Sequence, residues 1–205
     1  MVFEPRDVDA LALSGDPEEL AVALSEVRPR VARLVALRLD LRLRGRLDPS
    51  DVLQESFLDV HTRIDAWRTR RDMPFFLWVR FLVGQKLAEL HRRHLGAAAR
   101  DPRREVVGAL GRTPEASSET LAGALVAGGL SPSGVAIRAE QEAQLAAALE
   151  RLRPIDREVL ALRHFEGLSN AEVAAALELD AATASKRYLR ALGRLQAAVE
   201  GRAVE

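Results

Sequence analysis

Residues 168–192 read LSNAEVAAALELDAATASKRYLRAL, and this stretch decides the fold of the C-terminal part of the chain. Ser169 and Glu172 have the spacing of a capping box, in which serine caps a helix and the glutamate reaches back to the cap's own N–H. This short helix ends after two turns, three residues turn the chain, and Asp180 caps a longer helix that runs to about Val199. The layout predicts a helix-turn-helix.

The outer face of the longer helix carries the chemistry that a recognition helix needs in a DNA major groove. A plain helical bundle with a basic surface is the alternative, but the caps, the turn length and the small Ala174 at the helix crossing favour the DNA-binding motif. Base contacts are expected from Ser185, Lys186, Leu189 and Arg190. Thr183 and Arg187 are expected nearer the phosphates, and the full set of candidates is Thr183, Ser185, Lys186, Arg187, Leu189, Arg190 and Arg194.

The composition excludes several classes of protein. The chain has 205 residues, a net charge of zero and no cysteine, so a disulfide framework, a CxxC zinc site and a thiol nucleophile are excluded. It contains none of the GxxxxGK[ST], GxSxG or HExxH motifs, and we expect neither an enzyme nor a cofactor. His91 and His94 share a helix face, but surface positions are favoured over a metal site. The acidic N-terminus lacks the layout of a secretory signal, and we expect a cytoplasmic protein.

The zero net charge conceals alternating blocks along the chain. Residues 1–27 hold one arginine against seven acids, and residues 28–47 hold seven arginines against one acid. Residues 48–60 hold four acids and no basic residue, and residues 61–104 hold eleven basic residues against four acids. Solvated helix faces would explain any single block. Together the blocks indicate separate surfaces, some for a polyanion and some for a basic partner.

Helical signals run through almost the whole chain, and no stretch gives a convincing strand, so the fold class is predicted to be all-α. One apolar stripe covers residues 17–44, with a bend or restart expected at Pro29 and an interruption at Arg38. The sequence Asp48-Pro49-Ser50-Asp51 predicts a second helix start. A third helix is expected from Pro74 to about residue 94.

Glycine and proline concentrate between the two helical parts, which predicts a long flexible linker between two small domains. The predicted units are an acidic N-terminal tail (1–16), a helical domain (17–95), the linker (96–134) with one transient helix, and the helix-turn-helix domain (135–200).

Five aromatic residues lie within fifteen positions beside the basic loop of residues 68–73. They are Trp67, Phe75, Phe76, Trp78 and Phe81. Rings interleaved with basic side chains can hold single-stranded nucleic acid by base stacking, whereas their helical spacing favours ordinary core packing. Trp67 is expected to anchor one side of the loop.

With these residues assembled, the chain resembles an extracytoplasmic-function (group 4, sigma-70 family) sigma factor of bacterial RNA polymerase. DVLQESF at residues 51–57 resembles the family's region 2.2 motif. FFLWV at residues 75–79, followed by Gln85 and by ELHRR at residues 89–93, resembles regions 2.3 and 2.4. Residues 152–195 resemble region 4. The entry to region 4, Ser131-Pro132-Ser133, is similar to that of sigma factors from planctomycete-like bacteria.

The resemblance implies a function without catalytic chemistry. It implies that region 2, residues 17–95, binds core RNA polymerase, melts the promoter and captures a flipped base of the −10 element, and that region 4, residues 135–200, reads the −35 element as duplex. The polymerase-binding candidates, which would face a basic clamp coiled coil, are Asp51, Gln54 and Glu55. The −10 candidates are Arg68, Arg70, Arg71, Asp72, Arg80, Gln85, Lys86, Arg92 and Arg93. The expected partners are core polymerase, promoter DNA and an anti-sigma factor, with no membrane insertion.

The chain departs from the family pattern at several positions. Two other classes of protein are also compatible with parts of the sequence. Gln85 and Glu89 stand where asparagine and aspartate are usual, Glu178 replaces a turn glycine, and Ser185 replaces a lysine or arginine. Residues 156–192 also resemble the output domain of response-regulator and quorum-sensing activators, which carry an α/β domain upstream. A helical adaptor is the third alternative.

Overall fold

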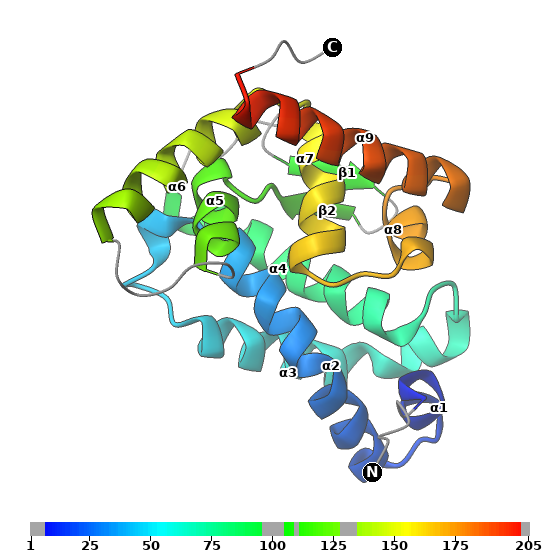
Figure 1. The fold of residues 1–205 in the computed structure, drawn as a ribbon. Helices are drawn as coiled ribbons and strands as arrows, with labels where there is room; N and C mark the ends of the chain where they lie inside the picture. Colours follow the sequence, from blue (N-terminus) through cyan, green and yellow to red (C-terminus); the bar gives the residue numbers. More distant parts are fainter. Residues whose placement is uncertain (1–6, 96–104, 109–110, 128–134, 202–205) are drawn as a thin grey trace, which may run out of the picture.

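The computed structural model describes residues 7–95, 105–108, 111–127 and 135–201 (Figure 1). The first six residues of the expected acidic tail and the Ser131-Pro132-Ser133 sequence lie outside these residues. Within the described ranges, no helix combines the length and the apolar character needed to cross a bilayer.

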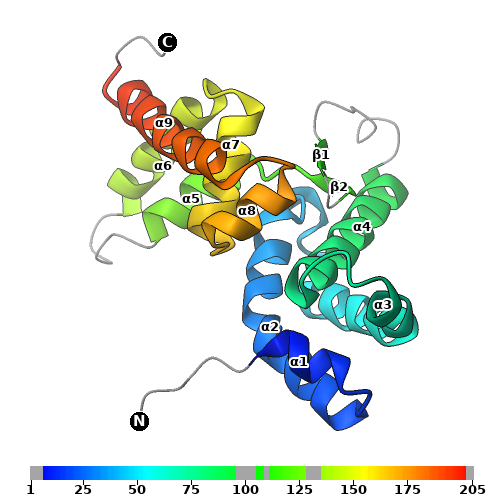
Figure 2. The same ribbon diagram turned by 90° about the vertical axis from the view of Figure 1, so that its right-hand side faces the viewer.

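The first four α-helices pack together, and we call them the N-terminal bundle (Figure 2). Each of the two longest starts at a proline that follows a capping aspartate: Asp16 accepts from the Glu18 N–H at 2.8 Å and Asp48 from the Ser50 N–H at 2.7 Å. The bundle consists of α1 (Val8–Leu13), α2 (Pro17–Arg38), a short 3₁₀ turn η1 (Leu41–Leu43), α3 (Pro49–Arg70) and α4 (Phe75–Leu95).

The C-terminal bundle contains the predicted helix-turn-helix. Its capping box is present, since the Ser169 side chain accepts from the Glu172 N–H and the Glu172 carboxylate accepts from the Ser169 N–H. Its elements are α6 (Val135–Glu150), α7 (Pro154–Leu160), a π-helical turn η4 (Ala161–Phe165), α8 (Asn170–Ala176) and α9 (Ala181–Val199). Helix α5 (Ser118–Ala127) precedes it, within the expected linker.

The all-α class is confirmed, with two local differences from the sequence expectation. Helix α2 continues through Pro29 without a restart and ends at Arg38, short of the residue 44 expected from the apolar stripe. A two-stranded antiparallel hairpin also lies within the expected linker, β1 (Glu105–Gly108) paired with β2 (Gly111–Pro114), although no strand was predicted. The strands are four residues long, too short for an alternation pattern to stand out.

The hairpin and the following helix pack against the bundles. Strand β2 lies on α4, where Gly84 faces Thr113 so closely that a Cβ at position 84 would be 2.6 Å from the threonine hydroxyl oxygen. Helix α5 packs on α6 and contacts α2. The described part of the linker is therefore folded onto both bundles.

The two bundles share their apolar cores. Leu162, Leu168 and Val173 of the C-terminal bundle are buried in the core formed by the N-terminal helices. In the opposite direction, Leu37 of α2 is buried in the smaller core that includes Leu149 of α6. The two predicted helical domains are thus docked on one another in this structure.

Candidate functional site

The outer face of α9 presents four of the seven residues predicted to contact the −35 element. Ser185, Lys186, Leu189 and Arg190 are exposed, and Leu189 has a relative accessibility of 64% despite its apolar side chain. Asp180 holds the start of the helix, since its carboxylate accepts from the Thr183 N–H at 2.8 Å and from the Thr183 hydroxyl at 2.6 Å. These two hydrogen bonds lower the pKa of Asp180 below its ordinary value.

Arg187 and Arg194 differ from these four because they contact α7. The carboxylate of Asp156 is buried, and it lies 2.5 Å from a guanidinium nitrogen of Arg194 and 3.9 Å from one of Arg187. Both arginine side chains are about three-quarters buried, with 28% of Arg187 and 25% of Arg194 exposed. In this structure Arg194 holds α9 on α7 and is less available to DNA than the sequence suggested, whereas Arg187 only approaches the same carboxylate and keeps part of its side chain exposed.

The turn between α8 and α9 explains one departure from the family pattern. Glu178 has a φ of +54°, in the left-handed region that side chains rarely adopt. Glycine adopts this conformation at lower cost, which accounts for the usual glycine there. The Asn170 side chain also donates to the Ala181 carbonyl at 2.7 Å and ties the two helices together.

The basic loop between α3 and α4 is a closed turn held from inside. The Trp67 indole N–H donates to the Met73 carbonyl at 2.9 Å, as expected for a residue that anchors the loop. Arg71 adopts a left-handed φ of +48° and its N–H closes α3 on the Trp67 carbonyl. Arg70 and Asp72 pair at 3.2 Å and are largely exposed.

The aromatic cluster is core packing. Trp67, Phe75, Phe76 and Trp78 are buried, and the Trp67 ring lies 5.3 Å from that of Phe75 and 5.9 Å from that of Trp78 between centroids. Phe81 is half-buried. The four buried rings cannot stack on bases and Phe81 packs against the same core, so the cluster as a whole is core packing in this structure.

Helix α1 supports the same loop, which sequence reasoning missed. The Asp9 carboxylate accepts from the Phe75 N–H at 2.8 Å and so caps the start of α4. Arg68, a −10 candidate, donates to the Ala12 carbonyl at 2.9 Å. Residues 8–13 were expected to belong to a tail, and instead they pack beside the loop.

The other −10 candidates lie further along α4. Gln85, Lys86 and Arg92 line a shallow hollow of about 420 Å³ between α3 and α4, and Arg93 is exposed nearby, paired with Glu89. Burial lowers the pKa of Lys86, but Asp59 at 3.1 Å and Glu55 at 3.6 Å outweigh it and raise that pKa.

The loop and the hollow are separate places. Gln85 is ten positions after the first residue of α4, and the helical rise therefore puts it about 15 Å along the axis from the loop. The loop and Gln85 therefore do not form one pocket in this structure.

The exposed face of α3 carries the polymerase-binding candidates. Asp51, Gln54 and Glu55 are all exposed and lie within about one turn. Leu58 follows on the same face and is 62% exposed, a residue that the sequence argument did not single out. An acidic face with an apolar residue suits a basic protein surface better than it suits DNA.

Comparisons with known proteins agree with this arrangement. The family described as Sigma-70, region 4 matches residues 142–195. The chain is 31% identical over 199 residues to the ECF RNA polymerase sigma factor SigD of Mycobacterium tuberculosis and of Mycobacterium bovis, covering 96% of this chain and 85% of each relative. The chain belongs to the ECF RNA polymerase sigma factors.

A solved structure extends the comparison to the fold. CnrH, in its complex with the cytosolic domain of CnrY, is 21% identical to this sigma factor, with a TM-score of 0.54 over 97% of this chain and 99% of CnrH. As an ECF sigma factor, the protein directs transcription initiation by RNA polymerase and is not an enzyme. Response-regulator activators carry an α/β domain upstream of the helix-turn-helix. The described residues of this chain contain no such domain, since their only strands form the antiparallel hairpin.

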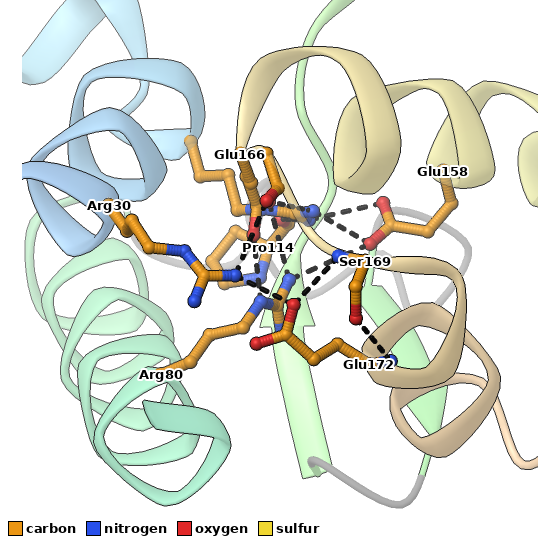
Figure 3. A network of polar contacts seen from close by, with 9 residues as sticks. Arg30, Arg80, Pro114, Glu158, Glu166, Ser169 and Glu172 are labelled. Atoms are coloured by element: carbon orange, nitrogen blue, oxygen red, sulfur yellow. Dashed lines mark hydrogen bonds and ion pairs between the residues drawn. The ribbon is translucent and has the colours of Figure 1, made fainter. Parts of the chain in front are cut away.

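Between the two bundles of the sigma factor lies a buried group of charges that the sequence did not reveal (Figure 3). We call Arg38, Arg80, Glu158 and Glu166 the inter-bundle cluster; the side chain of each is at most 3% exposed. Arg38 donates to Glu158 and to Glu166, each at 2.7 Å, and Arg80 donates to Glu166 at 2.7 Å. Arg38 also donates to the Pro114 carbonyl at 2.9 Å.

The cluster corrects the placement of Arg80. Arg80 was predicted to contact the −10 element, but in this structure it is buried against Glu166 and cannot reach DNA. Burial raises the pKa of Glu166, and the charges of Arg38 and Arg80 outweigh burial and hold that pKa below its ordinary value. The only sequence signal was Arg38, a charged residue that interrupts an apolar stripe.

Proposed function

We propose that this sigma factor reads the −35 element of its promoters with α9 of region 4 and opens and captures the −10 element with region 2. The exposed set Ser185, Lys186, Leu189 and Arg190 carries the −35 assignment. Lysine and arginine can donate to the acceptor atoms of guanine, and an apolar side chain fits the thymine methyl group. Thr183 and Arg187 are proposed to contact phosphates.

The test of −35 reading is Arg190→Ala. We expect a loss of about 1–3 kcal/mol in promoter binding and a relaxed preference at one or two base pairs, because a bidentate contact discriminates between bases. The measurement is holoenzyme binding to promoters with each −35 position varied. Arg151→Ala, which removes an exposed arginine just after α6, is the matched control. An equal loss on all sequences would reduce Arg190 to a phosphate contact and count against −35 reading by this residue.

For the −10 element we propose that the loop of residues 68–73 receives the flipped base and that Gln85, Lys86, Arg92 and Arg93 contact the strand further along α4. The support for this is an exposed basic loop whose shape is fixed from inside by Trp67 and from outside by α1. A base leaves the stack at a cost of a few kcal/mol, so a pocket for it must be rigid enough for its contacts to offset that cost.

Asp9 should therefore position the loop. We expect Asp9→Ala to lower the free energy of unfolding by about 1 kcal/mol, the usual value of a helix cap, and to slow promoter opening several-fold with polymerase binding unchanged. The measurements are denaturant unfolding and the rate of open-complex formation. Glu26→Ala makes the same change in net charge at an exposed position in the interior of α2 and should change neither. Equal opening rates for Asp9→Ala and the unsubstituted chain would contradict the positioning role.

The remaining parts of the proposal concern partners and origin. The face formed by Asp51, Gln54 and Glu55 is proposed to bind the basic clamp coiled coil of core RNA polymerase, which places the working protein in the cytoplasm. An anti-sigma factor is proposed as a further partner, supported by the shared fold with CnrH, which was solved with the cytosolic domain of CnrY. The planctomycete-like origin rests on the Ser131-Pro132-Ser133 sequence alone.

A further inference from the structure

We propose that Asp156 is a specificity-determining residue of region 4: its carboxylate withholds two arginines of α9 from the phosphates of random DNA, so that binding depends on the side chains that read bases. The inference rests on the proposed function, in which α9 reads the −35 element. It concerns a residue that is itself completely buried.

Among the described residues, three arginines lie within 4 Å of this one carboxylate. Arg194 of α9 lies 2.5 Å from it, and Arg187, two helical turns earlier on the same face of α9, lies 3.9 Å from it. Arg153, just before α7, donates to it at 3.0 Å. Asp156 belongs to the first turn of α7, which packs against α9 (Figure 1). One negative charge therefore attracts two arginines of the proposed recognition helix.

The two arginines of α9 are held unequally. Arg194 makes a close ion pair with Asp156, whereas the pair made by Arg187 is long. The Nε atom of Arg187 is also buried and donates no hydrogen bond within the part of the chain that the structure describes. Lys186 and Arg190, in contrast, are exposed on the outer face. Helix α9 thus carries basic residues that are open to DNA and basic residues that Asp156 retains, of which Arg187 is the easier to release.

A phosphate group must compete with Asp156 for the retained arginines. Phosphate contacts supply the affinity of non-specific binding and carry no sequence information. If Arg187 and Arg194 both turned to phosphates, they would leave the buried carboxylate short of counter-charge, which is costly. Base contacts at the −35 element fix α9 in register and can offset this cost for the weakly held Arg187. Random DNA offers no such contacts, so Asp156 discriminates against it.

The salt dependence of non-specific binding tests the proposal directly. Asp156→Asn keeps the shape of the side chain and removes its charge, and the full-length chain is titrated with a duplex that contains no promoter element. Each phosphate neutralised by a released arginine steepens the slope of log affinity against log salt by about 0.9. We expect a slope steeper by about 1–2, so the affinity of the variant relative to the unsubstituted chain falls about tenfold between about 50 and about 200 mM salt.

The preference for the −35 element should fall in the same variant. A helix that is held only by phosphates can shift along the duplex until each released arginine meets one, whereas a helix fixed by base contacts gains only the phosphates within reach. We therefore expect Asp156→Asn holoenzyme to prefer promoters with the −35 element over promoters without it by a ratio about three- to tenfold smaller. Glu140→Gln makes the same change in net charge at an exposed position of α6 and should alter neither the ratio nor the slope.

A double variant, Asp156→Asn with Arg194→Gln, covers the case in which circular dichroism shows that Asp156→Asn does not fold. It removes both charges of the closest pair, and proteins tolerate the replacement of a buried ion pair by neutral groups better than the loss of one partner. Because Arg187 is then the released arginine of α9, the slope should steepen by about 1.

Two results would overturn the proposal: a slope of the folded variant that is unchanged or shallower, or an undiminished preference for the −35 element. A carboxylate that merely holds α9 in place would, on removal, weaken binding to all DNA without steepening the slope. The slope is measured without promoter DNA. It therefore stays distinct from a failure of −35 reading, which would appear as a lack of preference in the unsubstituted holoenzyme.

Discussion

Reversal of two charges on α3, Asp51→Lys together with Glu55→Lys, will remove binding to core RNA polymerase while the protein stays folded. Both side chains are exposed and neither takes part in core packing, so the fold loses only the favourable position of Asp51 in the first turn of α3 and the surface pairing of Glu55 with Lys86 at 3.6 Å. Against a basic partner the new lysines replace attraction with repulsion, which costs several kcal/mol. That corresponds to an affinity loss on the order of a hundredfold or more.

Co-elution with purified core polymerase, followed by titration of a labelled chain, measures this loss. The matched control reverses two other exposed acids, Glu26→Lys on α2 and Glu140→Lys on α6, with the same change in net charge. The control should bind normally, because long-range charge effects are screened within about 10 Å at moderate salt. Normal affinity of the α3 variant would show that this face does not meet the polymerase.

The helices could be predicted because their starts depend on neighbouring residues. Asp48 with Pro49, and Ser169 with Glu172, satisfy backbone groups within three positions, and both signals were read correctly from the sequence. Helix α1 was missed because its six residues are too few for a periodic pattern, and it is held in place by contacts to Arg68 and Phe75 more than fifty positions away.

The inter-bundle cluster could not be predicted for a related reason. Arg38 and Glu158 are separated by 120 positions, and nothing near either residue indicates the other. A buried charge is recognisable from sequence only as an exception to an apolar stripe, which gives one partner of a pair and not the second. The same limit explains Arg80, whose charge suggested a surface position.

The sequence predicted which helix faces carry the site residues, but not which of these residues contact one another. Helical periodicity identified the polar positions of α9, yet it could not show that Arg187 and Arg194 turn toward the buried Asp156 while Arg190 points outward. The resemblance to the family placed the −10 candidates on α4 and on the loop before it. The rise along α4, however, separates Gln85 from the loop by about 15 Å.

Replacement of the loop tip, Arg70→Ser, Arg71→Gly and Asp72→Ser together, will abolish promoter opening while polymerase binding and −35 binding persist. The variant keeps Trp67, Met73 and Arg68, so the hydrogen bonds that close the loop and join it to α1 remain. Glycine at position 71 suits the φ of +48° that the arginine adopts there. The backbone should therefore keep its shape while the side chains that contact a flipped base are lost.

Permanganate reactivity of −10 thymines measures the opening, and Arg46→Ser, an exposed arginine before α3 with the same net-charge change, is the control that should open normally. A template already melted at −10 should partly rescue the loop variant, because the few kcal/mol needed to unstack the base no longer has to be offset by loop contacts. Duplex-only binding should be equal for both variants. Normal opening by the loop variant, or no rescue by the melted template, would assign strand capture to the hollow lined by Gln85, Lys86 and Arg92 instead.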